Sequence, residues 1–247
     1  MNFFKASAFA IATIAITGTP EIKAGEDNNS SKWYVTGSAG LSNPGDIESK
    51  RDNFTLNGNS VSIQYLLEHD DAAEYSIGAG YFLSPETRLE LNYLKSNYDL
   101  TKVGFNGTLS GTSAEVMIPA THDASVDSFI VSINKDFPYP SGWKPFIGAG
   151  IGLSSVSVND TTANLTAAGN ALGANLGTET VLTGSDNTVF TYQLRVGVAK
   201  DISKNTDVFT EVSYTATSGM SAGSGSSKID WKGVNSLAIK GGARYRF

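Results

Sequence analysis

Hydrophobic and polar residues alternate with a period of two along eight segments of the chain. Successive side chains of a β-strand point to opposite faces, so each segment predicts a strand with one apolar and one polar face. The segments are residues 32–41, 74–82, 88–98, 125–137, 145–158, 188–202, 207–217 and 234–247. The pattern therefore predicts an all-β protein.

The joints between these segments alternate between short and long. Residues 84–86, 139–142 and 203–205 have the composition of tight turns, whereas residues 42–73, 99–124, 159–187 and 218–233 form long polar connections, which we expect to be mobile loops. A turn centred on Pro85 places Tyr81 opposite Leu89. The next two turns pair Ile133 with Ala149, and Val196 with Val212. Each hairpin then has one continuous apolar face.

The first long connection contains a second kind of signal. Asn57-Gly58 is a preferred two-residue hairpin sequence. We therefore expect a small extension of the sheet within residues 53–65.

The C-terminal residues 240–247 carry the most specific pattern in the chain. Lys240, Gly242, Tyr245 and Phe247 have the spacing that resembles the C-terminal insertion signal of bacterial outer-membrane β-barrels, which the barrel-assembly machinery reads on the closing strand. Alternation puts Tyr245 and Phe247 on an apolar face, and Arg244 on a cationic face. An amphipathic edge strand of a soluble sheet is the alternative interpretation.

The N-terminus predicts export. Residues 1–24 combine a basic start, an uncharged apolar run and a polar tail ending in Ala24, which is the pattern of a signal peptide, with a retained anchor as the alternative. Cleavage would leave residues 25–247 as one barrel domain. It would remove two lysines and one glutamate, so the net charge of −6 becomes −7. Such an acidic chain is a poor partner for nucleic acid.

No later segment has the ~20 apolar residues of a transmembrane helix. Lipid admits only helices and closed sheets, because every backbone polar group must be hydrogen-bonded. We therefore predict an eight-stranded antiparallel transmembrane β-barrel with short periplasmic turns and long extracellular loops. A soluble, lipocalin-like barrel is the alternative, and it would place the apolar face inside.

The polar face of the strands would line the barrel lumen. We expect Arg195 and Glu211 to form an ion-pair cluster with Arg244 or Lys240, and Arg88 and Glu90 to lie on the opposite wall. The cluster would plug the barrel. The alternative is a narrow anion-preferring path, because the expected lumen has more basic than acidic residues. The full expected set is Lys32, Tyr34, Arg88, Glu90, Asn92, Asn134, Gln193, Arg195, Glu211, Lys240, Arg244 and Arg246.

Candidate catalytic and metal-binding residues are few. The two histidines, His69 and His122, fall in expected loops and lack the His-x-Ser pattern of lipid A deacylases, so we interpret them as solvated. The carboxylates near the strand ends have no calcium-binding spacing and are also interpreted as solvated. These carboxylates are Asp70, Asp71, Glu74, Asp123 and Asp127. No catalytic residue, metal or cofactor is predicted.

Three motifs, residues 75–81, 144–153 and 242–247, together resemble the opacity-like, porin-family outer-membrane β-barrels. This family is related to the rickettsial surface antigens and to the transmembrane domain of outer-membrane protein A. The resemblance implies a Gram-negative outer membrane, contact with its lipid and lipopolysaccharide, and a non-enzymatic structural or surface role with an extracellular ligand or host surface at the loops. A small diffusion channel is the alternative, followed by a lipid-modifying enzyme.

Overall fold

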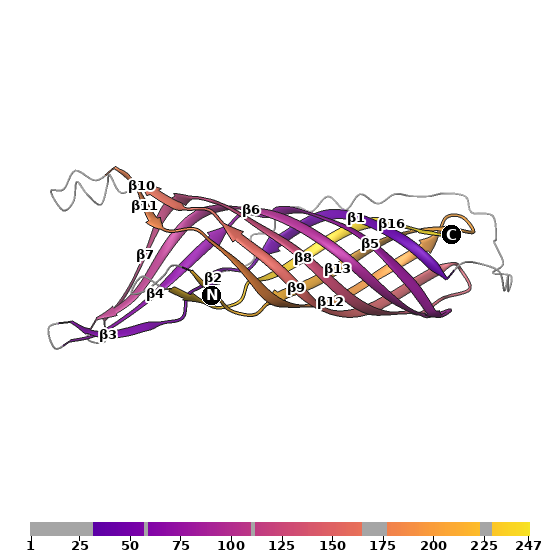
Figure 1. Ribbon diagram of the computed structural model, residues 1–247, viewed down its shortest axis with the longest axis horizontal. Helices are drawn as coiled ribbons and strands as arrows, with labels where there is room; N and C mark the ends of the chain where they lie inside the picture. The colour runs from indigo at the N-terminus through magenta and orange to yellow at the C-terminus, as the bar shows by residue number, and fades with distance from the viewer. Residues whose placement is uncertain (1–31, 57–58, 110–111, 165–176, 223–228) are drawn as a thin grey trace.

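Eight long strands form a barrel in the computed structural model, which describes residues 32–247 apart from 57–58, 110–111, 165–176 and 223–228 (Figure 1). The eight segments with period-two alternation all form strands of this barrel, and all but one lie within a few residues of their expected bounds; the exception, β6, runs on well beyond the expected end at residue 98. The barrel strands are β1 (Trp33–Pro44), β5 (Ala72–Ser84), β6 (Thr87–Leu109), β8 (Asp123–Asp136), β9 (Trp143–Val158), β12 (Ser185–Asp201), β13 (Thr206–Thr217) and β16 (Asn235–Arg246).

The barrel is closed by its first and last strands. β1 pairs with β5 on one side and with β16 on the other, and all neighbouring strands are antiparallel. Every barrel strand therefore has two hydrogen-bonded neighbours, which is the requirement for a sheet in lipid. The predicted fold class, an eight-stranded antiparallel barrel, is confirmed.

The predicted register of the three hairpins is also confirmed. Tyr81 pairs with Leu89, Ile133 with Ala149, and Val196 with Val212. The turns are stabilised locally, since the side-chain oxygens of Ser84 and Ser203 accept backbone N–H bonds from residues two and three positions further on. Gly142 has a φ of 79°, a left-handed conformation that favours glycine at this turn.

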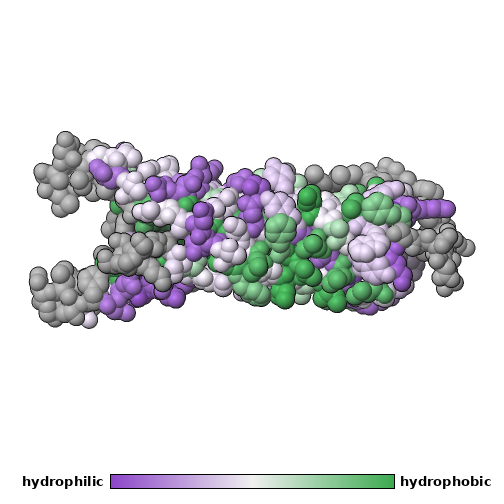
Figure 2. Space-filling view, in the orientation of Figure 1, coloured by the Kyte–Doolittle hydropathy of each residue, from purple (hydrophilic) through white to green (hydrophobic). Residues whose placement is uncertain are grey.

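The polarity of the barrel wall is inverted relative to a soluble protein. Large apolar residues such as Ile77, Ile151 and Leu194 are at least 56% exposed, whereas Arg88 and Glu211 are buried inside. Figure 2 shows hydrophobic residues gathered over the barrel portion of the visible face. The soluble alternative is wrong, because it requires the apolar face to be inside. No helix among the described residues is long and apolar enough to cross a membrane.

The barrel continues into an extension, built by segments that connect the barrel strands at the end opposite the tight turns (Figure 1). Residues 99–124, expected as a mobile loop, instead form strands for most of their length, because β6 runs on to Leu109 and pairs with β7. The other strands of the extension pair in a similar way. They are β2 (Ile47–Glu48), β3 (Asp52–Leu56), β4 (Asn59–His69), β7 (Thr112–Thr121), β10 (Thr161–Asn164), β11 (Thr178–Leu182), β14 (Met220–Ala222) and β15 (Ile229–Trp231).

The small extension of the sheet expected within residues 53–65 is present as β3 paired with β4, with Leu56 opposite Asn59, whereas Asn57 and Gly58 themselves lie outside the described residues. The extension has an apolar core, as expected for a sheet whose outer surface meets water. This core contains Ile47, Leu67, Leu100, Val103, Ala120, Ala163, Trp231 and Val234.

A β-bulge marks the change from barrel to extension on β6. Leu67 pairs with Val103, but His69 pairs with Leu100, so Thr101 is an extra residue on β6. Its hydroxyl donates to the carbonyl of Glu68 at 3.0 Å. An extra residue shifts the inward positions from even to odd numbers. Leu100 and Val103 therefore both point into the interior, where they are 3% and 0% exposed.

Two predictions fall outside the described residues. The signal peptide at residues 1–24 lies wholly outside them, and so do residues 165–176 of the long connection expected as a mobile loop at 159–187. Both remain predictions of the sequence.

Several large lumen side chains face a glycine on a neighbouring strand, which leaves room for them. A Cβ at Gly80 would overlap the ring of Tyr34, its partner on β1. We predict that Gly80→Val lowers the free energy of unfolding by about 1–3 kcal/mol, the usual effect of overpacking. Urea unfolding followed by heat-modifiable gel migration measures this. The matched control is Ala79→Val on the exposed lipid side, which should unfold near the wild-type midpoint; equal loss in both variants would contradict the packing argument.

Candidate functional site in the barrel lumen and mouth

A chain of alternating charges crosses the barrel lumen. Each member contacts the next at between 2.7 and 3.4 Å, and the chain joins β8, β6, β12, β13, β16 and β5. All of its side chains are buried. In order, the members are Asp136, Arg88, Glu90, Arg195, Glu211, Lys240 and Glu74. We call this set the lumen charge chain.

Glu90 is the central carboxylate of the lumen charge chain. Its Oε2 accepts from Arg88 Nη1 at 2.7 Å and from the Tyr34 hydroxyl at 2.7 Å. Its Oε1 accepts from Arg195 Nη1 at 2.7 Å. Arg195 therefore reaches Glu90 on β6 while its other nitrogens donate to Glu211 on β13. The two clusters that the sequence predicts on opposite walls are thus joined through Arg195.

One end of the lumen charge chain is Glu74 on β5, the second strand of the barrel. Lys240 lies 3.4 Å from Glu211 and 2.7 Å from Glu74. Gly40 on β1 is the partner of Lys240 on one side and of Glu74 on the other. Because Gly40 has no side chain, the Lys240 ammonium group can cross β1 to reach Glu74.

The sequence leaves open whether Arg244 or Lys240 joins Glu211, and the structure decides between them. Lys240 is the residue in contact with Glu211, whereas Arg244 binds Asp207 at 3.3 Å. The Arg244 guanidinium also lies over the Tyr34 ring, 5.2 Å from its centroid. Arg244 thus belongs to a second ion pair closer to the tight turns.

The expected excess of basic residues in the lumen was wrong. Sequence reasoning missed three buried carboxylates. Two of them carried a signal that could have found them, because Asp136 has the strand parity of Asn134 and Asp207 has that of Glu211. Glu74 is the third, so its interpretation as a solvated charge was also wrong. Lys32 is exposed at the strand end rather than inside. The buried charges comprise the basic Arg88, Arg195, Lys240 and Arg244 and the acidic Glu74, Glu90, Asp136, Asp207 and Glu211.

Hydroxyl groups line the interior beside the lumen charge chain and toward the extension. Ser38 contacts Ser76 at 2.6 Å, and Ser128 contacts Ser154 at 2.6 Å. Ser42 is hydrogen-bonded to the Tyr98 hydroxyl at 3.1 Å. The Ser128–Ser154 and Ser42–Tyr98 pairs lie between the charged part of the interior and the apolar core of the extension, whereas Ser38 and Ser76 lie one step further from the extension than Glu74.

The two histidines of the chain meet at the mouth of the barrel. His69 ends β4, His122 lies between β7 and β8, and their Nε2 atoms are 3.2 Å apart. His122 is 6% exposed, and its Nδ1 lies 2.6 Å from the Thr161 hydroxyl. The interpretation of both as solvated was wrong, because His122 is buried and His69 is half-buried, each next to strands that pack around an apolar core.

Burial makes both imidazoles harder to protonate. It lowers the pKa of His69 to about 4, and the nearby His122 adds to the decrease. Burial also lowers the pKa of His122, although the charge of Asp123 acts in the opposite direction. Both rings are therefore neutral at neutral pH.

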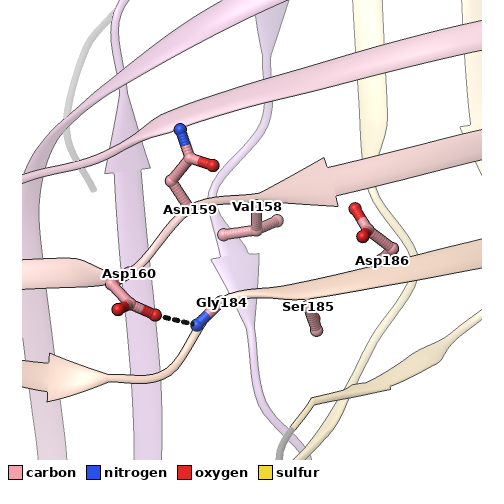
Figure 3. Close-up of a pocket in the computed structure, with 6 residues that line it drawn as sticks. All are labelled: Val158, Asn159, Asp160, Gly184, Ser185 and Asp186. Carbon is pink, nitrogen blue, oxygen red and sulfur yellow. Dashed lines mark hydrogen bonds between the residues drawn. The ribbon is translucent and has the colours of Figure 1, made fainter.

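A shallow cleft lies on the extension where β9 leads to β10 and β11 leads to β12. Figure 3 shows Asp160 and Asp186 on opposite sides of it, with Asp160 Oδ1 accepting the Gly184 N–H at 2.8 Å. Within the described ranges, no three His, Cys, Asp or Glu side chains converge as a metal site would require. The cleft therefore has no arrangement that indicates a particular chemistry.

The residues of the expected C-terminal signal lie on the closing strand β16. Tyr245 and Phe247 are 48% and 57% exposed on the lipid side, with ring centroids 5.6 Å apart. Lys240 points into the lumen, and Gly242 pairs with Ser38. Recognition of these residues by the barrel-assembly machinery stays a prediction.

Comparisons with known proteins agree with the architecture. No family model matches the sequence, and no curated protein is similar enough to count as a relative. Among solved structures, the chain is similar to Neisserial surface protein A, with 20% identity, a TM-score of 0.51, and coverage of 88% of this chain and 99% of that one. It is also similar to the outer membrane protease OmpT from Escherichia coli, with 10% identity, a TM-score of 0.50, and coverage of 87% and 96%. At these identities the likeness concerns the fold alone.

The closed barrel, its apolar exterior and its charged interior define an outer-membrane β-barrel protein. Its location is an outer membrane of the Gram-negative type. The predicted resemblance is confirmed at this level. Membership of the opacity-like family in particular remains a prediction, which is based on the sequence motifs.

Substitution of one member of the lumen charge chain tests how much the chain contributes to the free energy of unfolding. Glu211→Gln removes the shared partner of Arg195 and Lys240, which are both buried. We predict a loss of about 3–5 kcal/mol in the free energy of unfolding, because the variant leaves buried charge uncompensated. Urea unfolding in detergent provides the measurement. Glu86→Gln breaks the exposed pair with Lys135 and should change stability by less than about 1 kcal/mol; similar losses in both variants would contradict the role of burial.

Proposed function

We propose that the protein is a non-enzymatic, surface-exposed outer-membrane barrel whose lumen is closed to solutes and whose extracellular extension contacts molecules outside the cell. The observation that carries this proposal is the lumen charge chain. Its alternating charges satisfy one another across the interior. A barrel that conducts solutes needs a continuous water-filled path instead.

Aromatic side chains support a closed lumen as well. Tyr34, Phe146 and Phe209 are all buried, and the last two rings meet edge to face with centroids 6.3 Å apart. Arg88 lies over the Phe146 ring at 5.0 Å. A permeating ion would have to displace these rings or separate buried ion pairs. The near balance of charge also removes the argument for an anion-preferring path.

The extension supports a role in contact with the outside. Apart from its inward core, its visible surface is largely hydrophilic (Figure 2). It carries mixed charges, including the exposed pairs Lys102 with Glu68 and Lys50 with Asp230. A folded sheet on top of a closed barrel presents a fixed surface to an extracellular ligand or host surface. Lipid and lipopolysaccharide would contact the barrel wall below it.

The histidine geometry favours a non-enzymatic role. A nucleophile must be reachable by its substrate, but the Thr161 hydroxyl next to His122 belongs to a residue that is only 1% exposed. The remaining nitrogen contact of His122 is with His69. A lipid-modifying enzyme would change the mass of lipid A when expressed, and such a change would overturn this part of the proposal.

Planar-bilayer recording tests the closed lumen. We expect no steady conductance steps from the purified, folded wild-type barrel, because the lumen charge chain and the buried rings obstruct the path. A general porin inserted into the same bilayer is the positive control. Reproducible steps from the wild-type protein would support the small diffusion channel instead.

Cysteine labelling tests the orientation of the extension, since the chain contains no cysteine of its own. We expect Thr180→Cys, on exposed β11, to react with a membrane-impermeant maleimide on intact cells. The matched control is Ser141→Cys in the exposed turn between β8 and β9, which should react only after the outer membrane is permeabilised. The reverse pattern would contradict the proposed orientation.

A further inference from the structure

The histidine pair at the mouth of the barrel has no part in the proposed function, yet it is the most specific arrangement of side chains outside the lumen charge chain. His69 and His122 are the only two histidines of the chain, and they come from positions 53 residues apart. We propose that their two imidazoles form a binding site for a divalent transition metal of the zinc or copper class.

The spacing of the two nitrogens fits a chelated metal. Two imidazole nitrogens that each lie ~2.0–2.1 Å from a tetrahedral zinc ion are separated by about 3.3 Å. The Nε2 atoms of His69 and His122 are 3.2 Å apart. Their ring centroids are 5.3 Å apart, so the rings approach through their Nε2 edges rather than by stacking. Imidazole nitrogen suits zinc, copper and nickel, whereas calcium and magnesium prefer oxygen.

The surroundings hold His122 in the orientation of a metal ligand. Its second nitrogen, Nδ1, lies 2.6 Å from the hydroxyl of the buried Thr161. When Nδ1 donates its proton to that hydroxyl, Nε2 carries a free lone pair directed toward His69. A hydrogen bond of this kind from the outer nitrogen is the usual support of a metal-binding histidine.

The fold constrains His69 from the other side. It is the last residue of β4, next to the bulge at Thr101, and its partner on β6 is Leu100. The ring of Tyr98 meets it edge to face with centroids 6.5 Å apart. Two strands of the extension and the top of the barrel therefore fix the pair before any ion binds. Such preorganisation reduces the ordering that binding requires.

The electrostatic environment is suitable for a cation. Asp123 is adjacent to His122 in sequence, and its negative charge acts on that ring. No third His, Cys, Asp or Glu joins the pair among the described residues, so water would complete the coordination. The site should therefore bind more weakly than a closed site with four protein ligands.

Calorimetric titration of the full-length, tag-free barrel in detergent with Zn²⁺ and Cu²⁺ tests the proposal. We expect one ion bound per barrel, and no saturable binding of Mg²⁺. His69→Gln and His122→Gln should each abolish binding of the ion. Thr161→Val, which retains both ligands but removes the hydroxyl, should weaken binding by about 10–100-fold, and Thr161→Ser should restore it. Asp160→Asn, in the nearby cleft, should bind like the wild type.

Electron paramagnetic resonance of the Cu²⁺ complex provides a readout that does not depend on variants. Coupling to two imidazole nitrogens would identify the pair, because the chain has no other histidine. Heat-modifiable migration confirms that each variant is folded. The proposal is overturned if the wild type shows no saturable binding, if both histidine variants bind normally, or if the copper spectrum lacks imidazole coupling. In that case the pair is a hydrogen bond between two neutral rings.

Discussion

Closure of the sheet between β1 and β16 is the constraint on which the rest of the structure depends. Lipid offers no hydrogen-bonding partner to a free strand edge, so the first and last strands must pair. A closed barrel of eight strands has a narrow interior, and its apolar side chains have to face the lipid. The polar side chains are consequently crowded inside, where a charge is tolerated only when it is paired.

This crowding explains the composition of the lumen. Long charged residues face glycines on neighbouring strands, as Glu90 faces Gly80 and Arg195 faces Gly148. The glycines provide space for the side chains to cross, so the charges can reach partners on other strands. The resulting lumen charge chain ties six of the eight strands together.

Within one strand, β6, the inward-facing residues change from polar to apolar at the boundary between membrane and water. On β6, Glu90 faces a polar interior surrounded by lipid, whereas Val103 faces an apolar interior surrounded by water. The bulge at Thr101 lies between these two regions. The histidine pair occupies the same boundary, where backbone irregularity and a mixed environment allow two polar rings to be buried together.

The sequence by itself determined the barrel. Strict alternation and the tight turns specified the strand registers, since a slip of one residue would turn every apolar side chain inward. Parity also placed Arg195 and Glu211 inside. Only the tertiary structure decided how far the extension reaches beyond the hairpin predicted within residues 53–65, the choice of Lys240 rather than Arg244 beside Glu211, and the meeting of His69 with His122. These features depend on a bulge that breaks the period, and on contacts between strands distant in sequence, which a local pattern does not encode.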